Sequence, residues 1–136
     1  MKVNLGVESA TYDNGEKLND VMKYNHFGTE TIPPRPVLRI GAEGYLKSSA
    51  FNTALGAYLK NVITYTKAGR TEDLKKAELE LCRKMGDGSV TEAKRIIQSG
   101  SGLQHNAPLT VAKKGSDKPL FDTGLMLSKI NYQIEE

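Results

Sequence analysis

The strongest constraint on this chain is a long central region in which apolar residues recur with helical spacing. Between residues 51 and 63 the apolar side chains fall on one helical face. They are Phe51, Leu55, Tyr58, Leu59, Val62 and Ile63. Ala68-Gly69 then ends the pattern as a helix C-cap does. The spacing predicts an amphipathic helix over about 43–67.

A second helical pattern follows directly. Thr71 precedes Glu72 and Asp73, which is typical of a helix start because these side chains satisfy or complement exposed backbone N–H groups. The predicted inner face comprises Leu74, Ala77, Leu81, Met85, Ala93, Ile96 and Ile97. Gly86 and Gly88 weaken the middle, each by about 1 kcal/mol relative to alanine. The apolar residues before and after them nevertheless share a face, so we predict one long helix over about 72–98.

Short strands are predicted at both ends of the sequence, where apolar and polar residues alternate. The apolar positions are Val3, Leu5 and Val7 at one end and Ile130, Tyr132 and Ile134 at the other. A short helix is predicted over 16–24, and one helical turn through 125–127. The prolines at 33, 34 and 36 favour extended backbone before the first long helix. Together these elements predict a single α+β domain over 1–136, with a small, mostly antiparallel sheet packed against two long helices.

Composition argues against several classes of protein. Nineteen basic residues against 16 acidic ones give a net charge of +3, without the dense basic stripe of a dedicated nucleic-acid binder. The single cysteine, Cys82, can form neither an internal disulfide nor a structural zinc site, and we interpret it as a small core residue. No apolar run approaches the ~18 residues of a membrane span, and the first residues lack the apolar core of a signal peptide.

No constellation of residues predicts catalysis. His26 and His105 are not at metal-ligand spacing. The sequence 114–118, KGSDK, lacks the pattern of a phosphate-binding loop. The acids of residues 72–80 alternate with lysines, which indicates a solvated, salt-bridged helix face. We therefore expect no catalytic residue, no cofactor and no metal, and a protein that is not an enzyme.

Two further segments carry a resemblance. Residues 25–39 read NHFGTETIPPRPVLR, and residues 107–124 read APLTVAKKGSDKPLFDTG. In this order, with two helices between them, they resemble the virion-morphogenesis, or tail-completion, family of tailed bacteriophages. The chain departs from the family pattern at His26, at Val37 and over 125–129.

The resemblance implies a structural virion protein of the neck or proximal tail end, made in the bacterial cytoplasm, which completes the tail and joins it to the head. It implies a ring, expected to be a hexamer. The implied partners are other copies of the chain, the tail terminator or tail tube, and the head-closure and portal proteins. Genomic DNA would pass through the ring lumen without being read, and no membrane is involved.

The two segments also supply the candidate interface residues, because prolines stiffen an extended arm and arginine offers a planar fork of donors. The candidates are Phe27, Gly28, Thr29, Pro34, Arg35, Pro36, Arg39, Leu109, Lys114, Asp117, Lys118, Asp122, Thr123 and Gly124. We expect Gly28 and Gly124 to supply backbone freedom, and residues 99–119 to form a long interaction loop. All of these residues could instead stabilise the monomer. A tail terminator or head–tail adaptor ring, a small nucleic-acid-binding accessory protein and an enzyme of unknown type remain alternatives.

Overall fold

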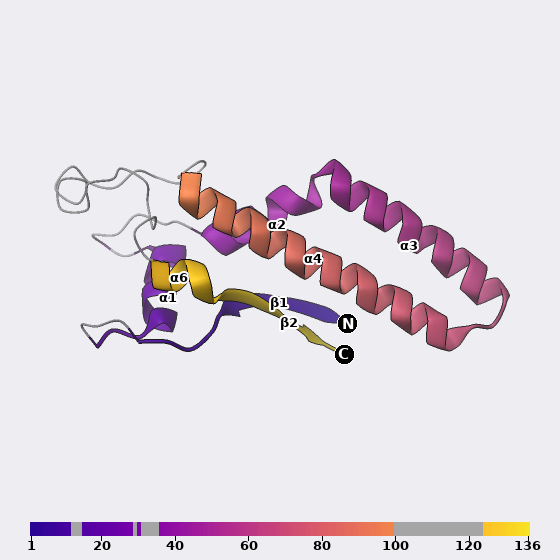
Figure 1. Ribbon diagram of the computed structural model, residues 1–136, viewed down its shortest axis with the longest axis horizontal. Helices are drawn as coiled ribbons and strands as arrows, with labels where there is room; N and C mark the ends of the chain where they lie inside the picture. Colours follow the sequence, from indigo (N-terminus) through magenta and orange to yellow (C-terminus); the bar gives the residue numbers. More distant parts are fainter. Residues whose placement is uncertain (12–14, 29, 31–35, 100–123) are drawn as a thin grey trace.

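The computed structural model describes residues 1–11, 15–28, 30, 36–99 and 124–136, without the side chains at 125 and 126. Its elements follow the order β1 (Lys2–Val7), α1 (Leu18–Phe27), α2 (Val37–Leu46), α3 (Ser49–Lys67), α4 (Thr71–Ser99), α6 (Gly124–Lys129) and β2 (Ile130–Glu135). Figure 1 shows an elongated molecule: α3 and α4 form a hairpin that projects from one end, and α1 and α6 lie at the other. The predicted α+β class is confirmed.

Helix α4 is the centre of the fold. It packs against α2 and α3 on one side and against β1 and β2 on the other (Figure 1). The helix is continuous from Thr71 to Ser99, which confirms the prediction of one long helix through Gly86 and Gly88. Gly69 closes the turn between α3 and α4 with a positive φ of 68°, a conformation that glycine adopts without steric cost.

The two terminal strands pair with each other, as their alternation suggested. In the described part of the chain, β1 and β2 form a two-stranded antiparallel sheet in which Leu5 lies opposite Tyr132 and Val7 lies opposite Ile130. Residues directly opposite each other share a face, so the apolar residues of both strands form one surface. That surface packs on α4.

Three glycines allow unusually close packing around α4. A Cβ at Gly86 would overlap the ring of Tyr132 from β2, and a Cβ at Gly88 would overlap the ring of Tyr45 from α2. A Cβ at Gly41 would lie 2.8 Å from Ala93. The glycines that weaken the helix locally are therefore the sites where two tyrosine rings lie against its backbone.

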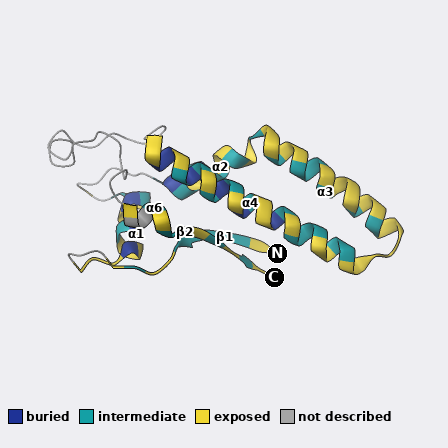
Figure 2. Cartoon of the chain, viewed as in Figure 1, coloured by how far each residue is buried: buried dark blue, intermediate teal, exposed yellow. Residues whose placement is uncertain are grey.

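The buried core lies at one end of the molecule and not along the whole hairpin (Figure 2). It is built from α1, α2, α4 and the start of β2. Its members are Leu18, Met22, Val37, Ala93, Ile96, Ile97 and Ile130. Helix α3, by contrast, has no buried residue along its full length. Burial is therefore deep only where α4 packs against elements besides α3.

Several predicted boundaries were wrong. The first helix spans 18–27 instead of 16–24. Helix α2 starts at Val37, directly after Pro36, whereas the first long helix was predicted to start at about residue 43. Proline is tolerated at a helix start because the first N–H groups have no partner within the helix, and the φ of Pro36, −77°, fits that role.

The predicted helix over 43–67 is divided in two. The break falls at Lys47 and Ser48, between α2 and α3. The Ser48 hydroxyl donates to the Tyr45 carbonyl at 2.6 Å and accepts from the Phe51 N–H at 3.2 Å. Ser48 therefore ends one helix and caps the next, a role that an apolar periodicity does not reveal.

The predicted inner faces also need correction. In the middle of α4 the buried residues are Cys82, Gly86 and Ser89, whereas the predicted Leu74, Ala77, Leu81 and Met85 are half-buried. The prediction that Cys82 is a core residue is confirmed. On α3, the predicted inner residues Leu59 and Ile63 are 51% and 58% exposed.

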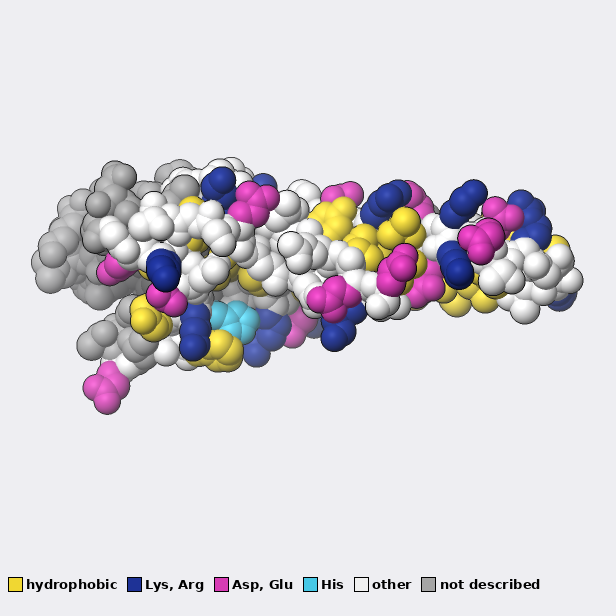
Figure 3. Space-filling model, turned by 90° about the horizontal axis from the view of Figure 1, so that it is seen from below, with side chains coloured by type: hydrophobic (Ala, Val, Ile, Leu, Met, Phe, Trp, Pro, Cys, Tyr) yellow, Lys and Arg dark blue, Asp and Glu magenta, His cyan; other side chains and the backbone are white. Residues whose placement is uncertain are grey.

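Ion pairs lie on the helix surfaces, as predicted for the face near residues 72–80. Arg70 pairs with Asp73 at 2.6 Å, and Lys75 with Glu72 at 3.6 Å. Arg95 pairs with Glu92 at 2.5 Å. In Figure 3, acidic and basic side chains are interspersed along the molecule with hydrophobic ones between them. Such exposed pairs contribute little stability, typically below about 1 kcal/mol each.

Candidate functional site

The described parts of the two motif segments lie at the same end of the folded molecule. Val37, at the end of the first segment, belongs to the same core cluster as Ile96 and Ile97, which precede the second. Leu127, which follows the second segment, packs against this cluster. Figure 1 shows the end of α1, the start of α2, the end of α4 and the start of α6 grouped there. We call this region the motif end.

Phe27 is the most exposed large hydrophobic residue described at the motif end. It is the last residue of α1, and 71% of it is exposed. Its ring meets that of His26 edge-on, with centroids 4.7 Å apart, and Tyr24 one turn earlier is 50% exposed. Aromatic residues left in water at adjacent positions are typical of surfaces that a partner covers.

Two of the candidate residues are glycines, Gly28 and Gly124, which were predicted to supply backbone freedom. Gly28 has a φ of 76°, and its N–H donates to the Tyr24 carbonyl at 2.8 Å, so it ends α1 in a conformation that favours glycine. Gly124 opens α6, and none of the described residues lies within 4 Å of a Cβ added there. The prediction of backbone freedom is confirmed for Gly28, and for Gly124 it stays a prediction.

Pro36 and Arg39 lie at the start of α2. The Pro36 carbonyl accepts from the Ile40 N–H at 3.0 Å, which gives Pro36 a structural role. Arg39 is exposed, and its Nε lies 4.0 Å from Glu43 Oε1. A pair this long and this solvated binds the guanidinium weakly, so its donors are presented to solvent.

The remaining candidates fall outside the described residues. They are Thr29, Pro34, Arg35, Leu109, Lys114, Asp117, Lys118, Asp122 and Thr123. The predicted interaction loop over 99–119 also lies there, apart from Ser99, the last residue of α4.

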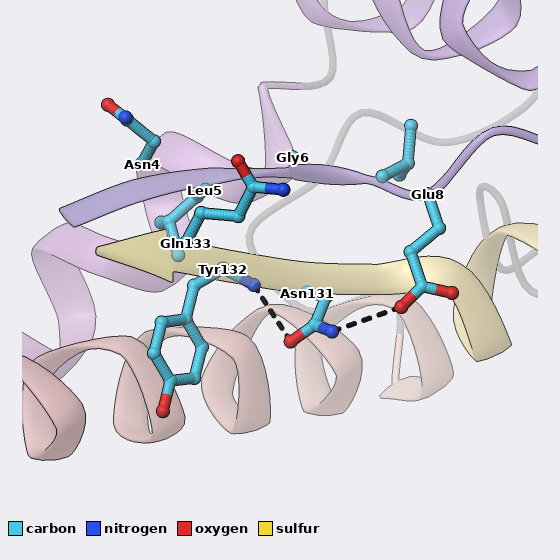
Figure 4. Close-up of a pocket in the computed structure, with 8 residues that line it drawn as sticks. Asn4, Leu5, Gly6, Glu8, Asn131, Tyr132 and Gln133 are labelled. Carbon is cyan, nitrogen blue, oxygen red and sulfur yellow. Dashed lines mark hydrogen bonds between the residues drawn. The ribbon is translucent and has the colours of Figure 1, made fainter. Parts of the chain in front are cut away.

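A shallow pocket of about 230 Å³ lies on the sheet (Figure 4). Its polar side chains contact one another: Asn131 Nδ2 donates to Glu8 Oε1 at 3.1 Å, and Asn131 Oδ1 accepts from the Tyr132 N–H at 2.9 Å. Glu8 also lies 3.8 Å from Lys129 Nζ. Among the residues that line this pocket, Glu8 carries the one carboxylate, and it is held by an amide and an ammonium.

A second, larger depression of about 360 Å³ runs between α3 and α4. Its lining is small or mixed in charge: Ala54, Ala57, Tyr58, Asn61, Tyr65, Asp73, Lys76, Ala77, Glu80, Leu81 and Lys84. Asp73 is already paired with Arg70. Leu59 and Ile63 do not line this groove, so α3 presents two different surfaces.

The shifted pKa values belong to structural contacts. Burial against α4 raises the pKa of Tyr132, and its hydrogen bond to Asp87 raises it further. The hydrogen bond from Arg95 lowers the pKa of Glu92, and the same contact raises that of Arg95. Sequence reasoning missed the Tyr132 contact, although glycines inside a helix are a known signal of close backbone approach.

The described residues contain neither a candidate metal-binding cluster nor a candidate membrane-spanning helix. Among these residues no three side chains of His, Cys, Asp or Glu are grouped so that they could hold a metal ion. No helix in the described part of the chain combines the length and apolarity needed to cross a membrane.

Comparison with known proteins gives no family for the chain: no protein-family model, no curated protein and no solved structure matches it.

Proposed function

We propose that this chain is a structural, non-enzymatic subunit of a long-tailed bacteriophage, which completes the proximal end of the tail and joins it to the head. The proposal starts from the two segments, 25–39 and 107–124, that resemble the tail-completion family in order and content. The observation that carries it is the convergence of their described ends at the motif end. Val37, Ile96, Ile97 and Leu127 pack together there, although the two segments lie far apart in sequence.

This convergence supports an assembly role because loops carried by one rigid end can contact one neighbour together. The described residues next to the two segments, Val37 and Leu127, pack in or against the buried core. The exposed ring of Phe27 and the solvated guanidinium of Arg39 lie beside them. An apolar anchor next to a charged group suits a protein–protein interface.

The shape of the molecule supports the same role. The hairpin of α3 and α4 projects beyond the sheet, and α3 buries none of its side chains within the chain (Figures 1 and 2). A helix with such a surface gains stability when a partner covers it, and this is what neighbouring subunits in a ring do.

The proposed assembly is a ring, expected to be a hexamer, that lies in the virion neck. The tail terminator or tail tube would contact one side, and the head-closure and portal proteins the other. DNA would pass through the lumen. A tail terminator or head–tail adaptor ring is the nearest alternative, since it differs only in its neighbours.

Subunit-resolved electron microscopy of virions from the phage that encodes this chain tests the proposal. We expect a ring of this chain at the head–tail junction, and its neighbours decide between tail completion, terminator and adaptor. Absence of the chain from intact virions would contradict the proposal.

Deletion of residues 108–118 tests the role of the second segment. We expect the deleted chain to keep its helical circular dichroism and cooperative unfolding, because the core lies outside the deletion. We also expect it to be absent from particles. Loss of cooperative unfolding would show instead that the segment stabilises the monomer.

A further inference from the structure

The exposed apolar surface of α3 is the starting point of a further inference. Leu59 and Ile63 are spaced four residues apart, so they lie on one face of the helix, and more than half of each is exposed. Neither residue lines the groove between α3 and α4. We call these two residues and the lysines near them, Lys60 and Lys67, the α3 patch.

Charge limits what can cover the α3 patch. Helix α3 contains two lysines and no acidic residue. A second α3 patch placed against the first would bring like charges together, which disfavours a symmetric contact of α3 with α3. The surface that covers it should be apolar and carry acids.

The chain has such a surface on α1. Tyr24 and Phe27 are 50% and 71% exposed, and Asp20 lies on the same helical face. The exposed charged residues described between 16 and 30 are the acids Glu16, Asp20 and Glu30 and the bases Lys17 and Lys23. Three acids against two bases give a net charge of −1 over residues 16–30, where Asp20 and Lys23 of α1 balance and the excess acid comes from the flanking residues. Helix α3 by itself carries +2. We call Asp20, Tyr24 and Phe27 the α1 patch.

The positions of the two patches determine the kind of assembly. Helix α1 lies at the motif end and α3 in the projecting hairpin, so they are different surfaces of one molecule (Figure 1). One chain can use both patches at once, each with a different neighbour. A contact between two unlike surfaces repeats around a ring when its rotation closes.

We propose that the α1 patch of one copy of this chain docks on the α3 patch of the next copy. Phe27 and Tyr24 cover Leu59 and Ile63, and the acids of the α1 region face Lys60 and Lys67. This contact rests on the proposed function, because it specifies how the ring subunit meets its neighbour.

Two single variants and their mixture test the contact. Phe27→Asp disables the α1 patch, and Ile63→Asp disables the α3 patch. Thr91→Asp, at an exposed position of α4 outside both patches, controls for the added charge. Circular dichroism and thermal unfolding establish that all three fold, and sedimentation velocity up to about 1 mM measures association, a range that reaches even weak contacts.

A contact between the α1 patch and the α3 patch predicts different association for each variant alone and for their mixture. Wild type and Thr91→Asp should form dimers and larger species, and each patch variant alone should associate about tenfold more weakly or worse. An equimolar mixture of the two patch variants should form heterodimers and stop there, because one intact pair of patches remains. Homodimers of Phe27→Asp, or a mixture that stays monomeric, would overturn the contact.

Wild-type protein that stays monomeric at about 1 mM would also overturn it, and would leave another protein as the occupant of the α3 patch. Microscopy of virions separates this failure from failure of the proposed function. Heterodimers in solution without a ring in the virion would refute the function alone. A virion ring in which α1 and α3 of neighbouring copies do not touch would refute the contact alone.

Discussion

Individual glycines decide how closely the elements approach α4. Alanine at Gly86 would gain about 1 kcal/mol of helix propensity but would overlap the ring of Tyr132. Overpacking of this kind costs about 1–3 kcal/mol, so we expect Gly86→Ala to lower the free energy of unfolding by roughly 1 kcal/mol. Denaturant unfolding, monitored by circular dichroism, measures the change.

Gly56 provides the matched control. It lies inside α3 with nothing within 4 Å of an added Cβ. Gly56→Ala should therefore raise the free energy of unfolding by about 0.5–1 kcal/mol. Equal effects of the two substitutions would show that the contact of Gly86 with Tyr132 has no energetic weight.

The contact of Tyr132 with α4 makes the free energy of unfolding depend on pH. Its pKa is raised by burial and by the hydrogen bond to Asp87, so the folded chain retains the phenolic proton at a pH where the unfolded chain loses it. The contribution of this contact is fully present below the ordinary tyrosine pKa of about 10, and is lost as pH rises through the higher folded value.

Replacing this tyrosine isolates its effect. Tyr132→Phe keeps the ring and removes the titrating group, so its free energy of unfolding should fall less steeply above about pH 10 than that of wild type. Unfolding by denaturant at several pH values between neutral and about 11 measures the slope. Tyr58→Phe, in the groove between α3 and α4, is the control for general tyrosine loss. Identical slopes for wild type and Tyr132→Phe would contradict the prediction.

At the scale of elements, the hairpin joins two helices of unequal burial. Helix α4 has six buried residues, whereas α3 has none. Local opening is easiest where few apolar contacts hold an element. In dilute protein we expect amide hydrogens of α3 to exchange faster than those of α4 between residues 82 and 97, as mass spectrometry with deuterium can show. Equal protection of both helices would mean that α3 is held by contacts beyond those within the chain.

At the motif end, in contrast to the hairpin, the elements share a buried core. Helix α1, the start of α2, the end of α4 and the start of β2 share one core although they come from four regions of the sequence. The loops of both motifs thus start from a well-packed base. In the first motif, the exposed residues Phe27 and Arg39 can therefore change without removing a core contact, whereas Val37 belongs to the core.

At the scale of the whole molecule, charge bears on the nucleic-acid-binding alternative. The net charge is +3, and the basic side chains of the exposed helices are interspersed with acids (Figure 3). Tight DNA binding needs several lysines or arginines that neutralise phosphates together. We expect the isolated chain to bind labelled duplex DNA weakly at physiological salt, as fluorescence anisotropy can measure. Tight binding with a steep dependence on salt would favour the alternative.

The sequence by itself determined the elements whose pattern is local. The periodicity of residues 71–97 predicted α4 through its two glycines, and alternation predicted both strands, because a helix or strand with one buried face repeats its apolar residues at a fixed spacing. The α+β class followed from these elements. The two motif segments are also contiguous, so their resemblance to the tail-completion family could be proposed from the sequence alone.

Only the tertiary structure decided what covers each face. Cys82, Gly86 and Ser89 are buried because the sheet packs on their side of α4, and Leu59 and Ile63 are exposed because nothing in the described chain packs on theirs. An apolar pattern shows that a face should be covered, but it does not identify the cover, which comes from residues far away in the chain. The same holds for the motif end, where residues from four regions meet through packing that no local pattern encodes.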